Sequence, residues 1–282
     1  METASEGSKL KLSVYGGTGF VGSEFVRCSK FETERLTREN LDPSFSEVVY
    51  FVGTTDNYNV LENPKLDIEV NLEFLIDQLE TLRKKFSTFR FNYISSWFVY
   101  GDAQKPPFKE SGPCEPKGFY SISKFAAELF IKSYCATYGI EYRIIRLSNI
   151  FGSSDGGVSK KKNALQHLVN EIKNHKTINL YEGGDFVRDY LEVRDAAAAI
   201  DCILENAPYG ITVNVGSGEP TRFLDLMTRA KEIFESNSEL ESIETPEFHK
   251  IVQVRDSWLD TSILRSYGFV PKYPIIGEIS NL

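Results

Sequence analysis

The sequence predicts an α/β protein with a doubly wound parallel sheet and a smaller α/β subdomain toward the C-terminus. Three observations lead to this prediction. Short apolar segments with strand character alternate with longer amphipathic segments through the first 150 residues. A glycine-rich turn directly follows the first of these strands. From Gly152 onward the chain becomes polar and rich in turn residues, which indicates the start of a second unit.

The predicted elements follow from periodicity and from turn residues at their ends. Strands are expected over residues 10–15, 31–36, 47–55 (with its turn), 89–94, 142–150, 178–181, 187–193 and 211–215. Helices are expected over residues 20–29, 64–85, 119–132, 164–174, 194–206 and 222–235. A polar loop over residues 153–162 should cover the site, and a charged linker should follow the last helix.

The composition is that of a globular protein with a sizeable core. The chain has 282 residues, of which 41% are hydrophobic and 26% are charged. Its net charge of −8 argues against a nucleic-acid or acidic-membrane partner, because both need a basic face. A small anionic ligand remains compatible, since local donors hold a phosphate whatever the net charge is.

Cysteine and histidine usage fits a reducing compartment without a metal site. The four cysteines are scattered and show no C-x-x-C spacing, and the three histidines form no H-x-x-x-H pattern. Residues 1–9 lack the apolar run of a signal peptide. No stretch approaches the ~18 apolar residues that a membrane span needs. We therefore expect a cytoplasmic protein with no membrane partner.

The glycine-rich turn has the features of a Rossmann-like dinucleotide site. Gly16, Gly19 and Gly22 form G-x-x-G-x-x-G between a strand and a helix that opens with Phe20 and Val21. A tight turn, close approach of a pyrophosphate and close helix–strand packing each exclude a Cβ. The free amides and the helix dipole then attract an anion.

The residues after the second strand should decide which cofactor binds. An acidic residue there favours the free 2′-hydroxyl of NAD, whereas an arginine accommodates the 2′-phosphate of NADP. Both Arg38 and Glu39 are present. We favour NADP through Arg38, with NAD as the alternative; a solvated charged turn is the structural alternative for both residues.

The third strand follows the second so closely that the usual intervening strand and helix should be missing. Thr54, in the turn after this strand, is expected to face the cofactor. The long helix that follows carries one polar residue, Asn71, in an otherwise broad apolar surface. Burial on more than one side indicates a possible dimer interface on this helix.

Polar residues at the end of the next strand point to a substrate site. Ligands of open parallel sheets lie outside the carboxyl ends of the strands, where Ser96 and Trp97 are placed. Tyr120 and Lys124 follow on a helix, four residues apart and therefore on one face. A neighbouring ammonium favours the phenolate and lowers the tyrosine pKa, so Tyr120 could exchange a proton near neutral pH. Y-x-x-x-K alone is a weak motif, because a surface lysine beside a half-buried tyrosine is common.

Together these motifs resemble the extended short-chain dehydrogenases/reductases, in the group of NAD(P)-dependent sugar-nucleotide epimerases and dehydratases. The resemblance covers nearly the whole chain. Its carriers, in order, are the glycine loop, Asn71, S-S-W-F-V-Y-G, Tyr120-x-x-x-Lys124, R-L-S-N-I-F-G, V-R-D-Y, N-V-G-S-G and W-L-D-T-S.

The resemblance implies roles for the matching residues. Ser96 would hydrogen-bond the 4-oxygen of the sugar, Tyr120 would act as acid/base on it, and Lys124 would bind the nicotinamide ribose. Asn71 would belong to the cofactor site. The positions matched to substrate phosphate or ribose contacts are Asn149, Arg188 and Arg255. An ion pair with Asp189 or Asp195 is the structural alternative for Arg188.

The resemblance also implies a domain division and an assembly. Residues 1–152 with 188–218 would form the NAD(P)-binding unit, and residues 153–187 with 219–282 the sugar-nucleotide subdomain. A homodimer is expected.

Departures from the family pattern narrow the chemistry. The family's 4,6-dehydratases carry an Asp-Glu pair after the catalytic threonine, where this chain has Trp97 and Phe98. We therefore expect hydride chemistry at C4: NADPH-dependent reduction of an NDP-4-keto-6-deoxyhexose, as in deoxysugar biosynthesis. The alternatives are an NAD-dependent NDP-sugar 4-epimerase and a non-catalytic nucleotide sensor, which need not keep Ser96, Tyr120 and Lys124.

Overall fold

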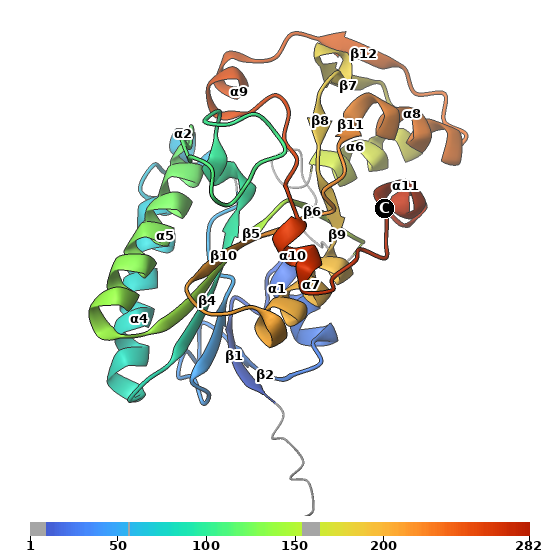
Figure 1. Ribbon diagram of the computed structural model, residues 1–282. Helices are drawn as coiled ribbons and strands as arrows, with labels where there is room; N and C mark the ends of the chain where they lie inside the picture. The colour runs from blue at the N-terminus through green and yellow to red at the C-terminus, as the bar shows by residue number, and fades with distance from the viewer. Residues whose placement is uncertain (1–9, 56, 154–163) are drawn as a thin grey trace, which may run out of the picture.

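One six-stranded parallel sheet organises the computed structural model, which describes residues 10–55, 57–153 and 164–282 (Figure 1). The strand order is β10-β5-β4-β3-β1-β2, and every pairing in it is parallel. The strands are β1 (Lys11–Tyr15), β2 (Glu32–Leu36), β3 (Glu47–Tyr50), β4 (Arg90–Ser96), β5 (Glu141–Leu147) and β10 (Ile211–Val215). The predicted fold class is confirmed.

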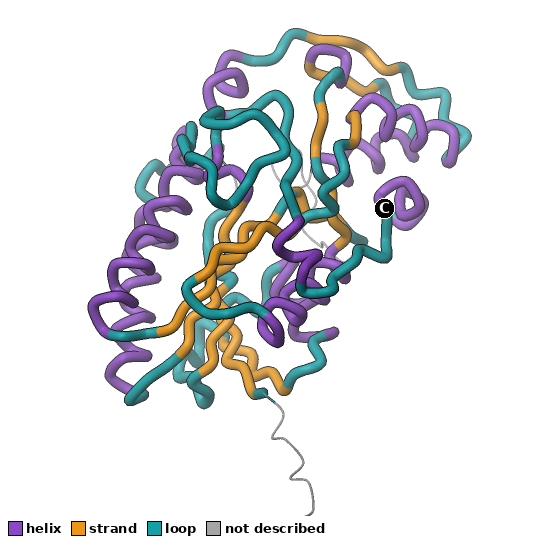
Figure 2. The backbone as a smooth tube through the Cα atoms, viewed as in Figure 1, coloured by secondary structure: helices purple, strands orange, loops and turns teal. Residues whose placement is uncertain are grey.

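Helices cover both faces of this sheet (Figures 1 and 2). One face packs against α4 (Phe74–Lys85) and α5 (Phe119–Tyr138), the other against α1 (Phe20–Cys28) and α7 (Val193–Asn206). Neighbouring residues of a strand point to opposite faces, so the four inner strands β1, β3, β4 and β5 contribute to both apolar clusters, whereas the edge strands β2 and β10 each contribute to one. The sheet is buried on both sides, as parallel sheets generally are.

Strand β2 forms one edge of the sheet, as the short connection predicted. The chain passes from β2 through residues 37–46 directly to β3, which pairs with β1 on its other side. The sequence of β2, ETERL, is mostly polar, and only Leu36 is fully buried. Charged side chains on an exposed edge discourage pairing with another chain.

The predicted helix over residues 64–85 is helical but not uniform, which corrects that prediction. It consists of α3 (Leu66–Ile68), a π-helical segment (Glu69–Glu73) and α4, and the short helix α2 (Asn59–Glu62) precedes it. Asn71 lies in the π-helical segment with its side chain buried. A widened turn of this kind often occurs at functional sites, because it redirects one side chain.

Two predicted strands are wrong in extent. The strand expected over 142–150 ends at Leu147, and β6 (Asn149–Phe151) leaves the sheet to pair with β9 (Tyr190–Glu192). The strand expected over 187–193 is interrupted at Asp189, which separates β9 from β8 (Val187–Arg188).

The buried carboxylate of Asp189 explains the second interruption. It accepts hydrogen bonds from the backbone N–H groups of Ser217, Gly218 and Leu259 at 2.8 to 3.2 Å, and from the Ser217 hydroxyl at 2.7 Å. A Cβ on Gly216 would lie 2.4 Å from an Asp189 oxygen, so the glycine permits this approach. One side chain thus joins the turn after β10 to the C-terminal segment.

A second lobe with its own apolar cluster lies beyond the carboxyl ends of the sheet (Figure 1). Two small sheets belong to it, in which β7 (Ile178–Tyr181) pairs with β12 (Leu240–Ile243), and β8 with β11 (Thr221–Arg222). Its helices are α6 (Ala164–Lys173), α8 (Phe223–Ile233), α9 (Glu247–Val252) and α11 (Ile275–Glu278), whereas α10 (Ser262–Ser266) returns to the main sheet and packs Leu264 into its core.

The predicted charged linker is wrong, because it contains β12 and α9. The domain division at residues 152 and 188 stays a prediction, and the loop expected over residues 153–162 lies almost entirely outside the described residues.

Candidate active site

A cavity of about 1020 Å³ lies between the carboxyl ends of the sheet and the second lobe. Thirteen of the predicted site residues contribute to its wall. These are Gly16, Gly19, Phe20, Val21, Gly22, Thr54, Ser96, Trp97, Tyr120, Lys124, Asn149, Arg188 and Arg255. Asn71 and Arg38 do not line it.

The glycine loop forms a cradle that fits a pyrophosphate. Gly16 has a φ of +75°, and a Cβ on Gly22 would lie 2.3 Å from the Gly16 carbonyl oxygen, so both positions require glycine. Helix α1 begins after Gly19 with no side chain capping its first N–H groups and no acidic residue in its first turn. Its N-terminus therefore presents unopposed positive charge to the cavity.

Lys124 is buried at the base of the cavity. Its Nζ donates to the Ile94 carbonyl at 2.7 Å and lies 4.2 Å from the centroid of the Tyr93 ring. A Cβ on Gly53 would be only 3.3 Å from this Nζ, so the turn after β3 lies directly against the ammonium. Burial lowers the pKa of Lys124 to about 7, and the charge of Glu128 opposes this shift.

Ser96 and Tyr120 face the cavity beside two stacked aromatic rings. The Ser96 hydroxyl accepts from the Phe98 N–H at 3.4 Å and begins the 3₁₀ turn Trp97–Tyr100. This turn stacks Trp97 on Phe98 with ring centroids 4.1 Å apart. The edge-to-face contact of Phe98 with Tyr120 has a centroid distance of 6.0 Å. The predicted catalytic residues thus share one wall with an aromatic pair.

A buried ion pair lies behind these residues. Glu128 accepts from Arg146 Nε at 3.0 Å and Nη2 at 2.6 Å, and from the Ser95 hydroxyl at 2.5 Å. Both charged side chains are almost fully buried. Glu128 lies on α5, one turn after Lys124. The ion pair therefore connects α5 with β5 and with the end of β4, which carries Ser96.

Asn71 is buried behind the cavity wall and stabilises the wall at Thr54. Its side-chain oxygen accepts from the Thr54 N–H at 2.9 Å, and its amide donates to the Thr54 and Ser123 hydroxyls, both at 2.8 Å. It therefore positions the turn after β3 against the helix that carries Lys124.

Arg188 faces the aromatic wall from the second lobe. Its guanidinium lies 5.7 Å from the Trp97 ring and 4.7 Å from the Phe186 ring, and burial lowers its pKa. The alternative of an ion pair with Asp189 or Asp195 is wrong, because both carboxylates accept hydrogen bonds from other groups. The donors to Asp189 are described above. Asp195 accepts from the backbone N–H groups of Lys272 and Tyr273. Arg188 Nη1 donates to the backbone carbonyls of Val187 and Arg255, so protein groups already engage one nitrogen of the guanidinium.

Arg255 and Asn149 are already engaged with protein groups. Arg255 lies within 3.8 Å of carboxylate oxygens of Glu182, Asp185 and Asp256. Asn149 accepts from the Trp97 indole at 3.3 Å and donates to the Asp189 carbonyl at 2.9 Å. A phosphate would have to compete for Arg255, whereas Asn149 fixes the Trp97 ring.

The candidate cofactor arginine Arg38 is exposed in the turn after β2, outside the cavity wall. Glu39 is exposed as well, and the neighbouring Thr37 side chain lowers the pKa of its carboxylate. Arg35, which the sequence analysis did not consider, also lies outside the cavity wall, and its Cγ would be 3.0 Å from a Cβ on Gly17 of the glycine loop. Strand alternation could have identified this position, because neighbouring residues of a strand point to opposite faces. Arg35 pairs with Val14 and points to the face opposite the buried Leu36.

An aromatic cluster in the cavity wall was not predicted from the sequence. Phe248 and His249 of α9 contact Tyr58, with ring centroids 5.4 and 5.5 Å apart, and the Tyr58 hydroxyl contacts His249 Nε2. Tyr181 lies 5.0 Å from the His249 ring. All four residues line the cavity. Because α9 is only six residues long, its apolar pattern is too short to identify.

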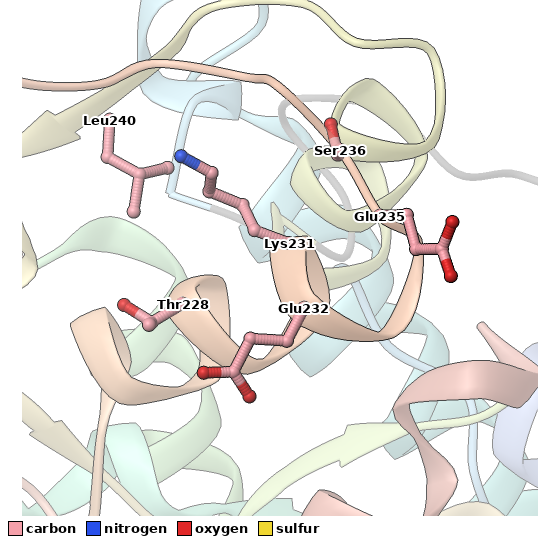
Figure 3. Close-up of a pocket in the computed structure, with 6 residues that line it drawn as sticks. All are labelled: Thr228, Lys231, Glu232, Glu235, Ser236 and Leu240. Atoms are coloured by element: carbon pink, nitrogen blue, oxygen red, sulfur yellow. The ribbon is translucent and has the colours of Figure 1, made fainter.

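A smaller hollow of about 340 Å³ lies on the surface of the second lobe, beside α8 (Figure 3). Its lining residues are Thr228, Lys231, Glu232, Glu235, Ser236 and Leu240. None of them belongs to the predicted site. Within the described ranges, no helix is long and apolar enough to cross a membrane, and no three His, Cys, Asp or Glu side chains form a metal site.

The fold is that of a Rossmann-like α/β protein, and comparison with known proteins identifies its family. A family model described as "NAD dependent epimerase/dehydratase family" matches residues 32–216. The chain belongs to this family, whose members act on nucleotide sugars with a nicotinamide cofactor.

Curated relatives include both activities in the family name. The chain is 28% identical to a putative UDP-glucose 4-epimerase of Methanocaldococcus jannaschii, over 76% of this chain and 79% of that protein. It is 26% identical to a dTDP-glucose 4,6-dehydratase of Mycolicibacterium smegmatis, over 74% and 72% of the two chains.

Solved structures support the fold. RMD from Pseudomonas aeruginosa, complexed with NADPH, has a TM-score of 0.81 at 22% identity and covers 97% of each chain. The UDP-glucose 4-epimerase of Thermus thermophilus, with NAD, has a TM-score of 0.83 at 22% identity and covers 96% and 97%.

We expect Lys124 to make the stability of the protein depend on pH. Its pKa is about 7 when folded and ordinarily 10.5. Between these values the unfolded chain binds more protons, so the free energy of unfolding rises with pH by up to ~1.4 kcal/mol per pH unit. Below pH ~7 both states keep the ammonium and the contribution levels off.

Urea unfolding between pH ~6.5 and ~9.5 measures this slope. Lys124→Met should lose it, whereas Lys65→Met, which changes an exposed lysine, should keep it. Equal slopes in wild type and Lys124→Met would contradict the burial of an ionisable ammonium.

Proposed function

We propose that the protein reduces the 4-keto group of a nucleoside diphosphate 4-keto-6-deoxyhexose with NADPH, in the cytoplasm. The observation that carries the proposal is the pair of stacked rings, Trp97 and Phe98, directly after Ser96 and against Tyr120. Elimination of water across C5–C6 needs acid/base groups at these positions. Rings there suit a sugar whose C6 is already a methyl group.

The described residues can perform the proton half of this reaction. NADPH, when bound, supplies the hydride. Tyr120 donates its phenolic proton to the carbonyl oxygen, and the Ser96 hydroxyl stabilises the same oxygen by a hydrogen bond. Lys124, one turn after Tyr120, lies against the turn that begins at Gly53 and would hold ribose hydroxyls there. Arg188 would take the substrate diphosphate.

A 4-epimerase is the second candidate, and the 28% identity to a putative UDP-glucose 4-epimerase favours it. The same three residues would serve it, since hydride would leave and return at C4. The two candidates differ in cofactor use: a reductase releases oxidised cofactor, whereas an epimerase recycles it. A non-catalytic sensor would not need Ser96, Tyr120 and Lys124 in one cavity wall.

NADP is the cofactor that we propose, with NAD as the alternative. Arg35 beside Gly17, with Arg38 on the following turn, would provide two guanidinium groups for a 2′-phosphate. The neighbouring structure complexed with NADPH is compatible with this choice.

A second copy of the chain would cover the outer surface of α4 and α5. Small or apolar residues at four- and three-residue spacing follow one line on α5, namely Ile122, Ala126, Leu129, Ser133 and Ala136. Ile122 and Leu129 are about half exposed, at 48% and 51%. Ile76 on the adjacent α4 is 38% exposed. Such spacing is typical of helix–helix packing, and a twofold axis would pair these helices with their copies.

The proposed reaction is tested by mixing the protein with NADPH and a nucleoside diphosphate 4-keto-6-deoxyhexose and following the absorbance of the reduced nicotinamide. Tyr120→Phe should lower turnover by about 10²–10⁴-fold, because it removes the proton donor, and should leave NADPH affinity nearly unchanged. Interconversion of UDP-glucose and UDP-galactose without net cofactor use would instead establish the epimerase. Cofactor binding with neither activity would favour the sensor.

Replacing Arg35 or Arg38 by glutamine should weaken NADPH binding by about 10–100-fold, since each charged hydrogen bond contributes ~1.5–3 kcal/mol. NADH lacks the 2′-phosphate, so its affinity should not change. Fluorescence titration of the bound reduced nicotinamide measures both. An equal loss for the two cofactors, or none for either, would contradict recognition of the 2′-phosphate by these residues.

Leu129→Glu should convert a dimer into a monomer, because it places a charge in the centre of the proposed α5 interface. Val270→Glu is the matched control, since Val270 is 69% exposed and lies away from α4 and α5. Light scattering after size-exclusion chromatography gives the mass. A monomeric wild type would refute this assembly.

A further inference from the structure

Glu182 has a backbone conformation that is unfavourable for a residue with a side chain. It begins the turn after β7 with a φ of +49°, in the left-handed region where a Cβ is crowded. Gly183 and Gly184 continue this turn with φ values of +66° and +76°, which glycine adopts without strain. Glycine would therefore suit position 182 better than glutamate does. Backbone strain of this kind is concentrated at functional sites.

The end of a helix does not explain this conformation. Among the residues that the structure describes, His175 and Glu235 are the two others besides glycine with a positive φ. Each lies two residues after a helix, α6 and α8 respectively, where a left-handed residue commonly ends the helix. Glu182 instead follows a strand. The reason for a glutamate at this position must therefore lie in its side chain.

The Glu182 side chain is open to the cavity. It is 54% exposed and belongs to the cavity wall. One carboxylate oxygen accepts from the Thr245 hydroxyl at 3.3 Å, and the other lies 3.8 Å from Arg255 Nε. Exposed contacts of this length contribute little stability, so they do not compensate for the strain. They also leave acceptor positions open, because a carboxylate can accept about four hydrogen bonds.

The neighbours of Glu182 place it beside the proposed diphosphate position, on the side away from the reaction centre. Arg188, which would take the diphosphate, donates to the backbone carbonyl of Arg255, and the Arg255 side chain approaches Glu182. In the opposite direction, Arg188 faces the ring of Trp97, the residue after Ser96. The diphosphate of a nucleotide sugar lies between the hexose and the ribose. A hexose at Ser96 therefore directs the ribose toward Glu182.

The charge of Glu182 restricts its ligand to a group that donates hydrogen bonds. A phosphate would be repelled by the carboxylate. The 2′- and 3′-hydroxyls of a ribose are two neighbouring donors, which match the two oxygens of one carboxylate. Acidic residues bind a ribose hydroxyl in the same way in NAD sites. A 2′-deoxyribose offers only one of the two donors.

We propose that Glu182 binds the 2′- and 3′-hydroxyls of the substrate ribose and thereby selects ribonucleotide sugars over deoxyribonucleotide sugars. The inference rests on the proposed function, because it assumes that the cavity holds a nucleotide sugar. Sugars carried by UDP, CDP or GDP would then be preferred to those carried by dTDP. The strained backbone at Glu182 is the consequence of placing a carboxylate in a turn that favours glycine.

Calorimetry on the full chain loaded with NADP tests this assignment. UDP, CDP and GDP are each compared with their 2′-deoxy forms, and the ratio of dissociation constants, deoxy over ribo, measures recognition of the 2′-hydroxyl. For the base that binds wild type most tightly, this ratio should be about tenfold. Glu182→Gly and Glu182→Ala should each bring the ratio close to one. The dissociation constant for NADP should not change.

Urea unfolding of the ligand-free protein measures the backbone strain separately. Glu182→Gly should raise the urea midpoint, because glycine adopts a positive φ without strain, whereas Glu182→Ala, which keeps a Cβ, should not. Glu235→Gly is the matched control, since it replaces a left-handed, exposed glutamate that lies outside this cavity wall. It should raise the midpoint as well and keep the wild-type ratio.

A wild-type ratio near or below one would overturn the inference, and so would a ratio that both Glu182 variants leave unchanged or an equal loss of NADP affinity. A urea midpoint that does not rise in Glu182→Gly would equally overturn it, because the glutamate would then be a structural residue. If no nucleoside diphosphate binds the NADP-loaded wild type, the proposed function fails and this inference with it. The other negative results contradict the role of Glu182 alone.

Discussion

The buried pair of Glu128 and Arg146 is the interaction on which the geometry of the site depends. Glu128 lies one turn after Lys124, which lies one turn after Tyr120, so its position fixes the height and rotation of α5. Arg146 and Ser95 anchor the same carboxylate to β5 and β4. Buried ion pairs contribute little net stability, but removal of one partner leaves an uncompensated charge. The pair therefore acts mainly by allowing only one placement of the helix against the strand ends.

A series of contacts along the cavity wall extends from the Glu128–Arg146 pair to the second lobe. Ser96 follows Ser95, and its turn stacks Trp97 on Phe98 against Tyr120. Asn149 fixes the Trp97 indole, and Arg188 faces that ring from the second lobe. Tyr120, the stacked rings of Trp97 and Phe98, and Arg188 thus form a continuous series of contacts between the two lobes. In the proposed function, this arrangement would offer the sugar one polar edge at Ser96 and Tyr120 and one apolar face at the rings.

The sheet, the glycine loop and the Tyr120–Lys124 pair were predictable from sequence, because each depends on residues that are close together in the chain. The ends of strands at Leu147 and Asp189 were not, since they depend on pairing with distant segments. Short elements such as α9 carry too few residues for a periodic signal, yet α9 brings Phe248 and His249 over the cavity. Arg35 precedes the turn after β2, and only the alternation within the strand places it on the face opposite the buried Leu36.

The destination of the hydride tests the central claim most directly. NADPH deuterated at the transferable position of the nicotinamide is incubated with the protein and a nucleoside diphosphate 4-keto-6-deoxyhexose, and the sugar product is examined by NMR. Reduction at C4 predicts one deuterium at C4 for each NADPH oxidised, and none in product made with unlabelled cofactor. Label at another carbon, or inversion at C4 of a nucleotide hexose with no net NADPH consumed, would contradict the reductase.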